Sequence, residues 1–291
     1  MPTLRPGGTR LMVTIVTDSS IDLPPAVAER LGIVIAPLSV AFADENLHDT
    51  GLDRGEFYRR LEAAPRPPSV TGASADAFVE AFAAAKEQGD EIACLVMSVE
   101  SSFTYVAAEV AVRQVPGLQI SIVNTGRSLA AQAALAIGAA ELATAGGTRE
   151  EIVRWIEDQS GAADTYLVPA SLEWLRRADR VTTLSQGPTG KLDGAIPLLR
   201  ARGRLTAVAK APAVDGAHDL MIEHAARAMD AGREQIVVVT HAVAPEAAEA
   251  VAARLSARIR CRSPLITELG PTVGAYLGPG TVGIGFCPAP V

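Results

Sequence analysis

Short β-branched runs alternate with longer alanine-rich runs through the first half of the chain. Residues 11–16 and 92–97 are apolar runs typical of buried strands, whereas residues 24–31 and 128–144 have the composition and spacing of helices. This alternation predicts a parallel sheet that is covered by helices on both faces. Further strands are expected at 33–42 and 120–123, and further helices at 53–61, 76–87, 105–112 and from 148, where Thr148 and Glu151 form a capping-box pattern.

The second half has a different pattern of strands and helices. Residues 198–209 read as two short strands around the turn signal Arg202-Gly203. Helices are expected at 217–229 and 245–255, and strands at 236–240, 264–269 and 282–286, the last two around a glycine-rich loop. The fold class is therefore α/β. We expect a disordered extension at 1–11, an N-terminal α/β domain at 12–165 with the parallel sheet, and a smaller α/β C-terminal domain at 166–291.

Composition narrows the function classes. The net charge of −7 and the absence of an arginine- and lysine-rich run with interleaved aromatics argue against a nucleic-acid partner. No apolar run is long enough to span a membrane, and the N-terminus lacks the apolar core of a signal peptide. The three cysteines are widely separated, which fits a reducing compartment. We expect a cytoplasmic protein without a metal site or a cofactor.

The first polar cluster, Thr17-Asp18-Ser19-Ser20, ends the first strand. Ligands of open α/β sheets lie beyond such strand ends, so Asp18 and Ser19 are candidate ligand-binding residues. The same side chains could instead cap the backbone N–H groups that follow. A phosphotransferase or hydrolase aspartate is a third reading of Asp18, but it needs a second carboxylate or a metal ligand, and the neighbouring sequence supplies none.

Two further loops carry hydroxyl groups between a strand or extended segment and a helix. The segment Ser69-Val70-Thr71-Gly72-Ala73-Ser74 precedes one expected helix, and residues 98–105, reading SVESSFTY, precede another. Either loop could bind an anion through its hydroxyls and the helix N-terminus, or could simply cap its helix. Because both loops occur next to neighbouring strands, a shared pocket is more plausible than either loop alone.

The glycine-rich segments do not carry nucleotide chemistry. Residues 278–285 have the wrong spacing for a dinucleotide fingerprint, and a strand follows them. A close backbone approach explains these glycines equally well. Residues 187–191 look like part of a phosphate loop, but Ser185 stands where its first glycine is required and Leu192 replaces its Ser or Thr.

Several segments together resemble the DegV family. Residues 15–24, reading IVTDSSIDLP, are similar to the opening of DegV proteins, and the terminal Gly278-Pro279-Gly280 is similar to their Gly-Pro-Gly. The intervening matches lie in the same order and extend the resemblance from about residue 12 to 287; they are residues 69–74, 98–105, 122–125 and 171–181.

The resemblance implies a two-lobed protein with a long-chain fatty acid in a tunnel between the lobes. It further implies a carrier rather than an enzyme, which in some members presents the lipid to a fatty-acid kinase subunit. Carried over to this sequence, the family pattern gives the ligand-binding residues Thr71, Ser102, Tyr276, Asp18, Ser19, Phe103, Arg180 and Gly278.

Four positions depart from the family pattern. Val70 replaces a threonine and removes one hydroxyl donor, and Phe103 replaces a glycine in the second loop. Tyr276 replaces a histidine, so the site keeps a donor there but carries no positive charge. Pro212 stands where many members carry an arginine. We therefore keep two alternatives to the fatty-acid carrier: an enzyme that uses Asp18, and a sensor of another amphiphilic ligand.

Overall fold

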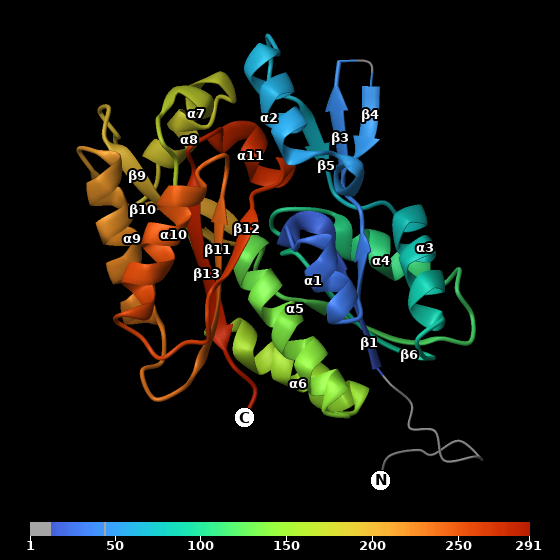
Figure 1. Cartoon of the computed structure of the whole chain (residues 1–291). Coiled ribbons are helices and arrows are strands. Elements are labelled where there is room, and N and C mark those ends of the chain that lie inside the picture. Colours follow the sequence, from blue (N-terminus) through green and yellow to red (C-terminus); the bar gives the residue numbers. More distant parts are fainter. Residues whose placement is uncertain (1–12, 44) are drawn as a thin grey trace.

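The computed structural model describes residues 13–43 and 45–291, so the expected extension at 1–11 lies outside the described residues. The first sheet has the order β2-β1-β6-β7, and every neighbouring pair is parallel, as the sequence predicts (Figure 1). Its strands are β1 (Val13–Asp18), β2 (Ile33–Ala36), β6 (Glu91–Val96) and β7 (Gln119–Asn124).

Helices cover both faces of this sheet, because alternate strand residues point to opposite sides. Ile15 and Leu95 face one apolar cluster with α5, while Val16 and Val96 face another with α3 and α4. The predicted capping box of α6 is present, since Thr148 and Glu151 each accept the other's backbone N–H. The helices are α3 (Ala75–Lys86) and α4 (Thr104–Val112) on one face, and α1 (Pro25–Arg30), α5 (Leu129–Thr144) and α6 (Arg149–Ser160) on the other.

The second sheet has the order β10-β9-β8-β13-β11-β12, and only β11 and β12 pair in parallel. The turn expected at Arg202-Gly203 joins β9 to β10. Strand β8 was not anticipated from the sequence. The strands are β8 (Asp164–Val168), β9 (Ile196–Arg202), β10 (Arg204–Ala211), β11 (Gln235–His241), β12 (Leu265–Glu268) and β13 (Val282–Pro288).

Helix α5 packs against both sheets and joins them into five layers. On β11, Ile236 and Val238 face the cluster of α5, whereas Val237 and Val239 face α9 (Val214–Ala228) and α10 (Pro245–Ser256) on the far side (Figure 1). The change from one sheet to the other falls between α6 and β8. Because α5 and α6 contact both sheets, the division into domains at residue 165 stays a prediction.

A third, antiparallel sheet of order β4-β3-β5 lies beside the ends of the larger sheets (Figure 1). The single strand expected at 33–42 is wrong: it is two strands in different sheets. The ladder stops at Ala36 because the Leu38 N–H donates to Ser19 Oγ (2.8 Å) and to Asp49 Oδ1 (3.0 Å) instead of to a strand. This sheet comprises β3 (Ser39–Phe42), β4 (Glu45–His48) and β5 (Ser69–Thr71), with η1 (Ser19–Ile21) and η2 (Asp49–Gly51) nearby.

Four further helices complete a cap over this region. They share an apolar cluster with β3 and with Leu199 of β9. Helix α11 occupies part of the segment expected to be a glycine-rich loop, and Pro271 stands at its first position, where a helix lacks an internal acceptor for an N–H. The cap helices are α2 (Arg54–Ala63), α7 (Glu173–Arg177), α8 (Val181–Ser185) and α11 (Pro271–Leu277). No helix within residues 13–43 and 45–291 is both long and apolar enough to cross a bilayer.

The close approach of α5 to β13 gives a test of the five-layer packing. A Cβ added at Gly285 would overlap the α5 backbone at Ala130 and Ala131, which cannot rotate away. We expect Gly285→Ala to lower the free energy of unfolding by about 1–3 kcal/mol, as overpacked cores do. Gly51→Ala, where a Cβ meets open space, is the matched control in urea denaturation. A Gly285→Ala protein as stable as the Gly51→Ala protein would contradict this packing.

Candidate ligand-binding site

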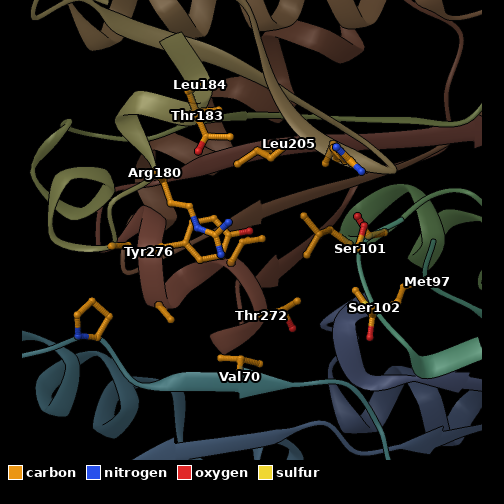
Figure 2. Close-up of a pocket in the computed structure, with 18 of the residues that line it drawn as sticks. Val70, Met97, Ser101, Ser102, Arg180, Thr183, Leu184, Leu205, Thr272 and Tyr276 are labelled. Carbon is orange, nitrogen blue, oxygen red and sulfur yellow. The ribbon is translucent and has the colours of Figure 1, made fainter. Parts of the chain in front are cut away.

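A cavity of about 1170 Å³ lies between the cap and the loops that follow the first sheet (Figure 2). The N-terminal half contributes residues 66–72 around β5, Met97 after β6, Glu100–Ser102 and Ser128–Leu129. The C-terminal half contributes residues 177–180, 183–184 and 186–187 in and around α7 and α8, the β9–β10 turn and α11. Both halves of the chain therefore build the cavity.

The two hydroxyl loops meet at this cavity. A Cβ added at Gly72 would overlap the hydroxyls of Ser102 and Thr104, so the backbone next to Thr71 touches the second loop. The Ser102 and Thr104 hydroxyl oxygens are 2.7 Å apart. Thr71, at the end of β5, and Ser102 both line the cavity. The structure thus brings together the two hydroxyl residues that the sequence singled out.

Charged side chains also line the cavity: Arg177, Asp179 and Arg180 come from the segment of α7 and α8, and Arg66, Glu100 and Arg204 come from other parts of the wall. The Arg180 guanidinium extends into the cavity and lies over the Tyr276 ring, 5.2 Å from its centroid (Figure 2). Burial raises the pKa of Tyr276 to about 12, although the nearby Arg180 opposes that shift. The phenol therefore stays protonated near neutral pH and can donate a hydrogen bond. Arg177 stacks on Trp174 and donates to the Ala64 carbonyl (2.6 Å), which ties α7 to the end of α2.

Aliphatic side chains form much of the remaining lining. Leu129 has a left-handed backbone with φ of 59°, which is unusual for a leucine and is a form of local strain that often occurs at binding sites. It begins α5 and is almost fully buried. Sequence reasoning missed Leu129 and Met97, although both come soon after parallel strands, where ligands bind. The principal apolar lining residues are Leu38, Val70, Met97, Leu129, Leu205 and Val273.

Asp18 and Ser19 do not line the cavity. Asp18 is fully buried and accepts hydrogen bonds from Ser20, from the Met97 N–H (2.8 Å) and from Gln132 Nε2 (3.0 Å). Ser19 Oγ donates to Asp49 (2.7 Å) and accepts the Leu38 N–H. The capping interpretation of this motif therefore matches the geometry, and the expectation of a ligand contact is corrected: both side chains are used inside the fold.

Phe103 and Gly278 also lie outside the cavity lining. Phe103 is 87% exposed at the start of α4, because its side chain points to solvent while Ser102 turns inward. Gly278 has φ of 73°, and a Cβ there would overlap the Trp174 indole, so close backbone approach accounts for this glycine. Of the eight residues expected at the site, Thr71, Ser102, Arg180 and Tyr276 share the cavity, and the other four do not.

Asp18 does have carboxylate neighbours that the local sequence did not reveal. Asp22 and Asp49 lie close enough to act on one another and on Asp18 electrostatically, and Arg54 lies 3.4 Å from Asp22. Burial is the main reason that the pKa of each of these three carboxyls is raised. Within the described residues, no group of three or more potential ligands could hold a metal ion.

The sequence is similar to proteins of one family over nearly its whole length. A family model described as "Uncharacterised protein, DegV family" matches residues 12–289. A DegV domain-containing protein of Streptomyces coelicolor is 33% identical over 276 residues, which cover 94% of this chain and 97% of the relative. The chain belongs to the DegV family. A second DegV domain-containing protein, from Halalkalibacterium halodurans, is 26% identical over 277 residues, 94% of this chain and 98% of its own length.

Solved DegV structures share the fold of this DegV chain. A Thermus thermophilus protein described as a DegV family protein with fatty-acid binding superposes with a TM-score of 0.84 at 24% identity, covering 96% of this chain and all of the other. DegV of Bacillus subtilis, described as a fatty acid binding protein, gives a TM-score of 0.81 at 24% identity, covering 96% and 99%. At this identity the likeness establishes the fold alone, and it confirms the predicted two-lobed DegV-like α/β class.

Asp22 gives a pH-dependent test of the buried carboxyl cluster in this DegV protein. Burial raises its pKa from 3.8 to about 7, so the folded protein keeps a proton that the unfolded chain loses between those pH values. Stability is then lost as pH rises through this window, by at most roughly 4 kcal/mol. We expect Asp22→Asn, which keeps an acceptor for the Gly270 N–H, to gain stability over the wild type between pH 5 and pH 8.

Urea denaturation at several pH values measures this difference. Asp193→Asn, at an exposed position, is the charge-matched control and should follow the wild-type curve. Parallel curves for wild type and Asp22→Asn across the whole range would contradict the assignment of a buried, protonated Asp22.

Proposed function

We propose that this chain binds one long-chain fatty acid in the cavity, with its carboxylate at the hydroxyls of Thr71 and Ser102. One observation carries the proposal: two hydroxyl loops and the Arg180 guanidinium converge on a cavity whose remaining wall is rich in aliphatic side chains. A carboxylate is the group that such donors and a nearby positive charge recognise, and an alkyl chain is what an aliphatic wall accepts.

The energetics of such a ligand favour a long chain. Each methylene that leaves water gains roughly 0.8 kcal/mol, so about ten buried methylenes gain about 8 kcal/mol. That gain corresponds to micromolar binding or tighter before the head group contributes. The acyl chain therefore supplies most of the affinity, and the hydroxyls with Arg180 set the orientation of the carboxylate.

The relatives support the same ligand class. The Thermus thermophilus and Bacillus subtilis structures are both described as fatty-acid binding, and this chain has their fold over nearly its whole length. The finer proposal, that the protein presents its lipid to a fatty-acid kinase subunit, follows from the family resemblance. The Asp18 side chain is fully buried and cannot contact a substrate, so no observation favours the alternative of an enzyme that uses it.

Removal of the two hydroxyls tests the head-group contact. We expect the Thr71→Val and Ser102→Ala substitutions each to weaken palmitate binding roughly tenfold, because each removes a hydrogen bond to a charged group. Thr182→Val is the matched control, since Thr182 is exposed on α8 and lies outside the cavity lining. Displacement of a fluorescent fatty acid gives the affinities, and native mass spectrometry of the purified protein shows whether a lipid mass is retained.

Methyl palmitate separates the fatty-acid proposal from a sensor of another amphiphile. The ester keeps the chain and loses the charge, so it should bind the wild type much more weakly than palmitate does, and the two hydroxyl variants should lose that preference. Equal affinity for acid and ester, or no uptake of either by delipidated protein, would rule out carboxylate recognition at this cavity.

An ATP assay distinguishes a carrier from a kinase. The isolated protein with palmitate, ATP and magnesium should release no ADP above background. Addition of a fatty-acid kinase subunit that accepts this chain should start ADP release that depends on the bound lipid. ADP release by the isolated protein that disappears in Asp18→Asn would instead favour the enzyme hypothesis.

A further inference from the structure

A second, smaller pocket of about 350 Å³ lies on the other side of the loop that follows β6. Arg127, from the turn after β7, and Arg202, from the β9–β10 turn, both line it. Ser98 and Asn124 contribute polar groups, and Glu100 is its one acidic side chain. Glu100 and Gly203 also line the large cavity, whereas Arg127, Arg202, Ser98 and Asn124 do not.

Among the residues that the structure describes, the hydrogen-bond partners of the two guanidinium groups are all backbone carbonyls. Arg127 is buried and donates to the carbonyls of Ala163 (2.6 Å), Gly126 (2.8 Å) and Gly161 (3.4 Å). Arg202 donates to the same Gly161 carbonyl (2.6 Å). Asp164 lies in this region, but its carboxylate is paired with Arg200. Within residues 13–43 and 45–291, no carboxylate forms an ion pair with Arg127 or Arg202.

Two neighbouring guanidinium groups repel each other, and this repulsion is unfavourable when neither forms an ion pair. The pKa of Arg127 is lowered to about 10, mainly by burial; the neighbouring Arg202 and Arg200 contribute to this shift, and Asp164 opposes it. Arg127 therefore remains charged at neutral pH. The pocket is therefore a local positive site in a protein whose net charge is −7.

Unused donors also face this pocket. Within the described part of the chain the Arg202 guanidinium makes one hydrogen bond, which leaves most of its N–H groups for a ligand. Asn124 Oδ1 accepts the N–H groups of Val99 and Gly126, so its NH₂ group is free to donate. The Ser98 Oγ accepts the Glu100 N–H, which leaves its hydroxyl hydrogen for a ligand.

We propose that this pocket binds a phosphate group through Arg202 and Arg127, with Ser98 and Asn124 as additional donors. Phosphate fits better than a carboxylate, because its further charge offsets two guanidiniums and its oxygens can meet donors from several directions. Glu100 opposes binding electrostatically. Its Oε2 would lie 2.6 Å from a Cβ at Gly203, so its carboxylate lies beside another residue of the pocket lining. The pocket shares only Glu100 and Gly203 with the fatty-acid cavity, and it is tested on protein without lipid.

Isothermal titration of delipidated protein with inorganic phosphate, at constant ionic strength set with chloride, tests the proposal. We expect Arg202→Gln to weaken binding at least roughly tenfold, since it removes a charge-assisted contact. Arg202→Lys should recover part of the loss. Glu100→Gln should have the opposite effect and tighten binding several-fold. Arg113→Gln, an equal charge change at an exposed position on the far end of α4, should leave the Kd within about twofold.

Acetyl phosphate and ATP, titrated in the same way, identify which phosphate compound the pocket prefers. The proposal is supported if any of the three compounds binds the wild type and this binding is lost in Arg202→Gln. The compound with the lowest Kd then identifies the preferred ligand. The proposal is overturned if no probe binds the wild type, or if binding is equal in Arg202→Gln and Arg113→Gln. Matching thermal unfolding curves for the Arg202 variants and the wild type exclude a folding defect as the cause of any loss.

Discussion

The packing of α5 between the two large sheets is the constraint on which the rest of the structure depends. From Leu129 to Ala140 every residue of this helix is buried, which is possible because it is rich in alanine and because glycine lies opposite it at Gly285 and within it at Gly138. Large side chains would force the sheets apart. Because both sheets contact one helix, that helix sets the spacing of the two halves that build the cavity.

The same helix connects this packing to the site. Its first residue, Leu129, lines the cavity, and its Gln132 donates to the buried Asp18. Asp18 in turn accepts the Met97 N–H, so β1, β6 and α5 meet at one carboxyl group directly beneath the cavity. The polar residues at the strand ends are thus divided between two tasks. Asp18 and Ser19 hold the strands and the helix together, while Thr71 and Ser102 lie at the surface of the cavity.

Periodicity predicted most of the helices and strands, because their apolar or alanine-rich patterns extend over four or more residues. It failed where long-range contacts decide the structure. The run at 33–42 is apolar except for Ser39, yet the hydrogen bonds that the Leu38 N–H donates to Ser19 and Asp49 divide it between two sheets. Helix α11 is short and rich in small residues, so its pattern could not be told from a loop, and Thr272 was missed with it.

The candidate site shows the same limit. Hydroxyl loops at strand ends predicted Thr71 and Ser102, and the geometry of Gly72 accounts for their proximity. Nothing local distinguishes Asp18 from them, since a carboxylate at a strand end can bind a ligand or cap the chain. Its role follows from Met97 and Gln132, which lie 79 and 114 residues away along the chain.

The position of Tyr276 changes the electrostatics of the site from those implied by the family pattern, which has a histidine there. A histidine changes charge near neutral pH, whereas the buried phenol has a pKa of about 12 and remains a neutral donor. The positive charge comes instead from the Arg180 guanidinium, which lies over the phenol ring. The cavity thus pairs a neutral phenol donor with a guanidinium, whereas the family pattern implies a single imidazole that both donates and titrates.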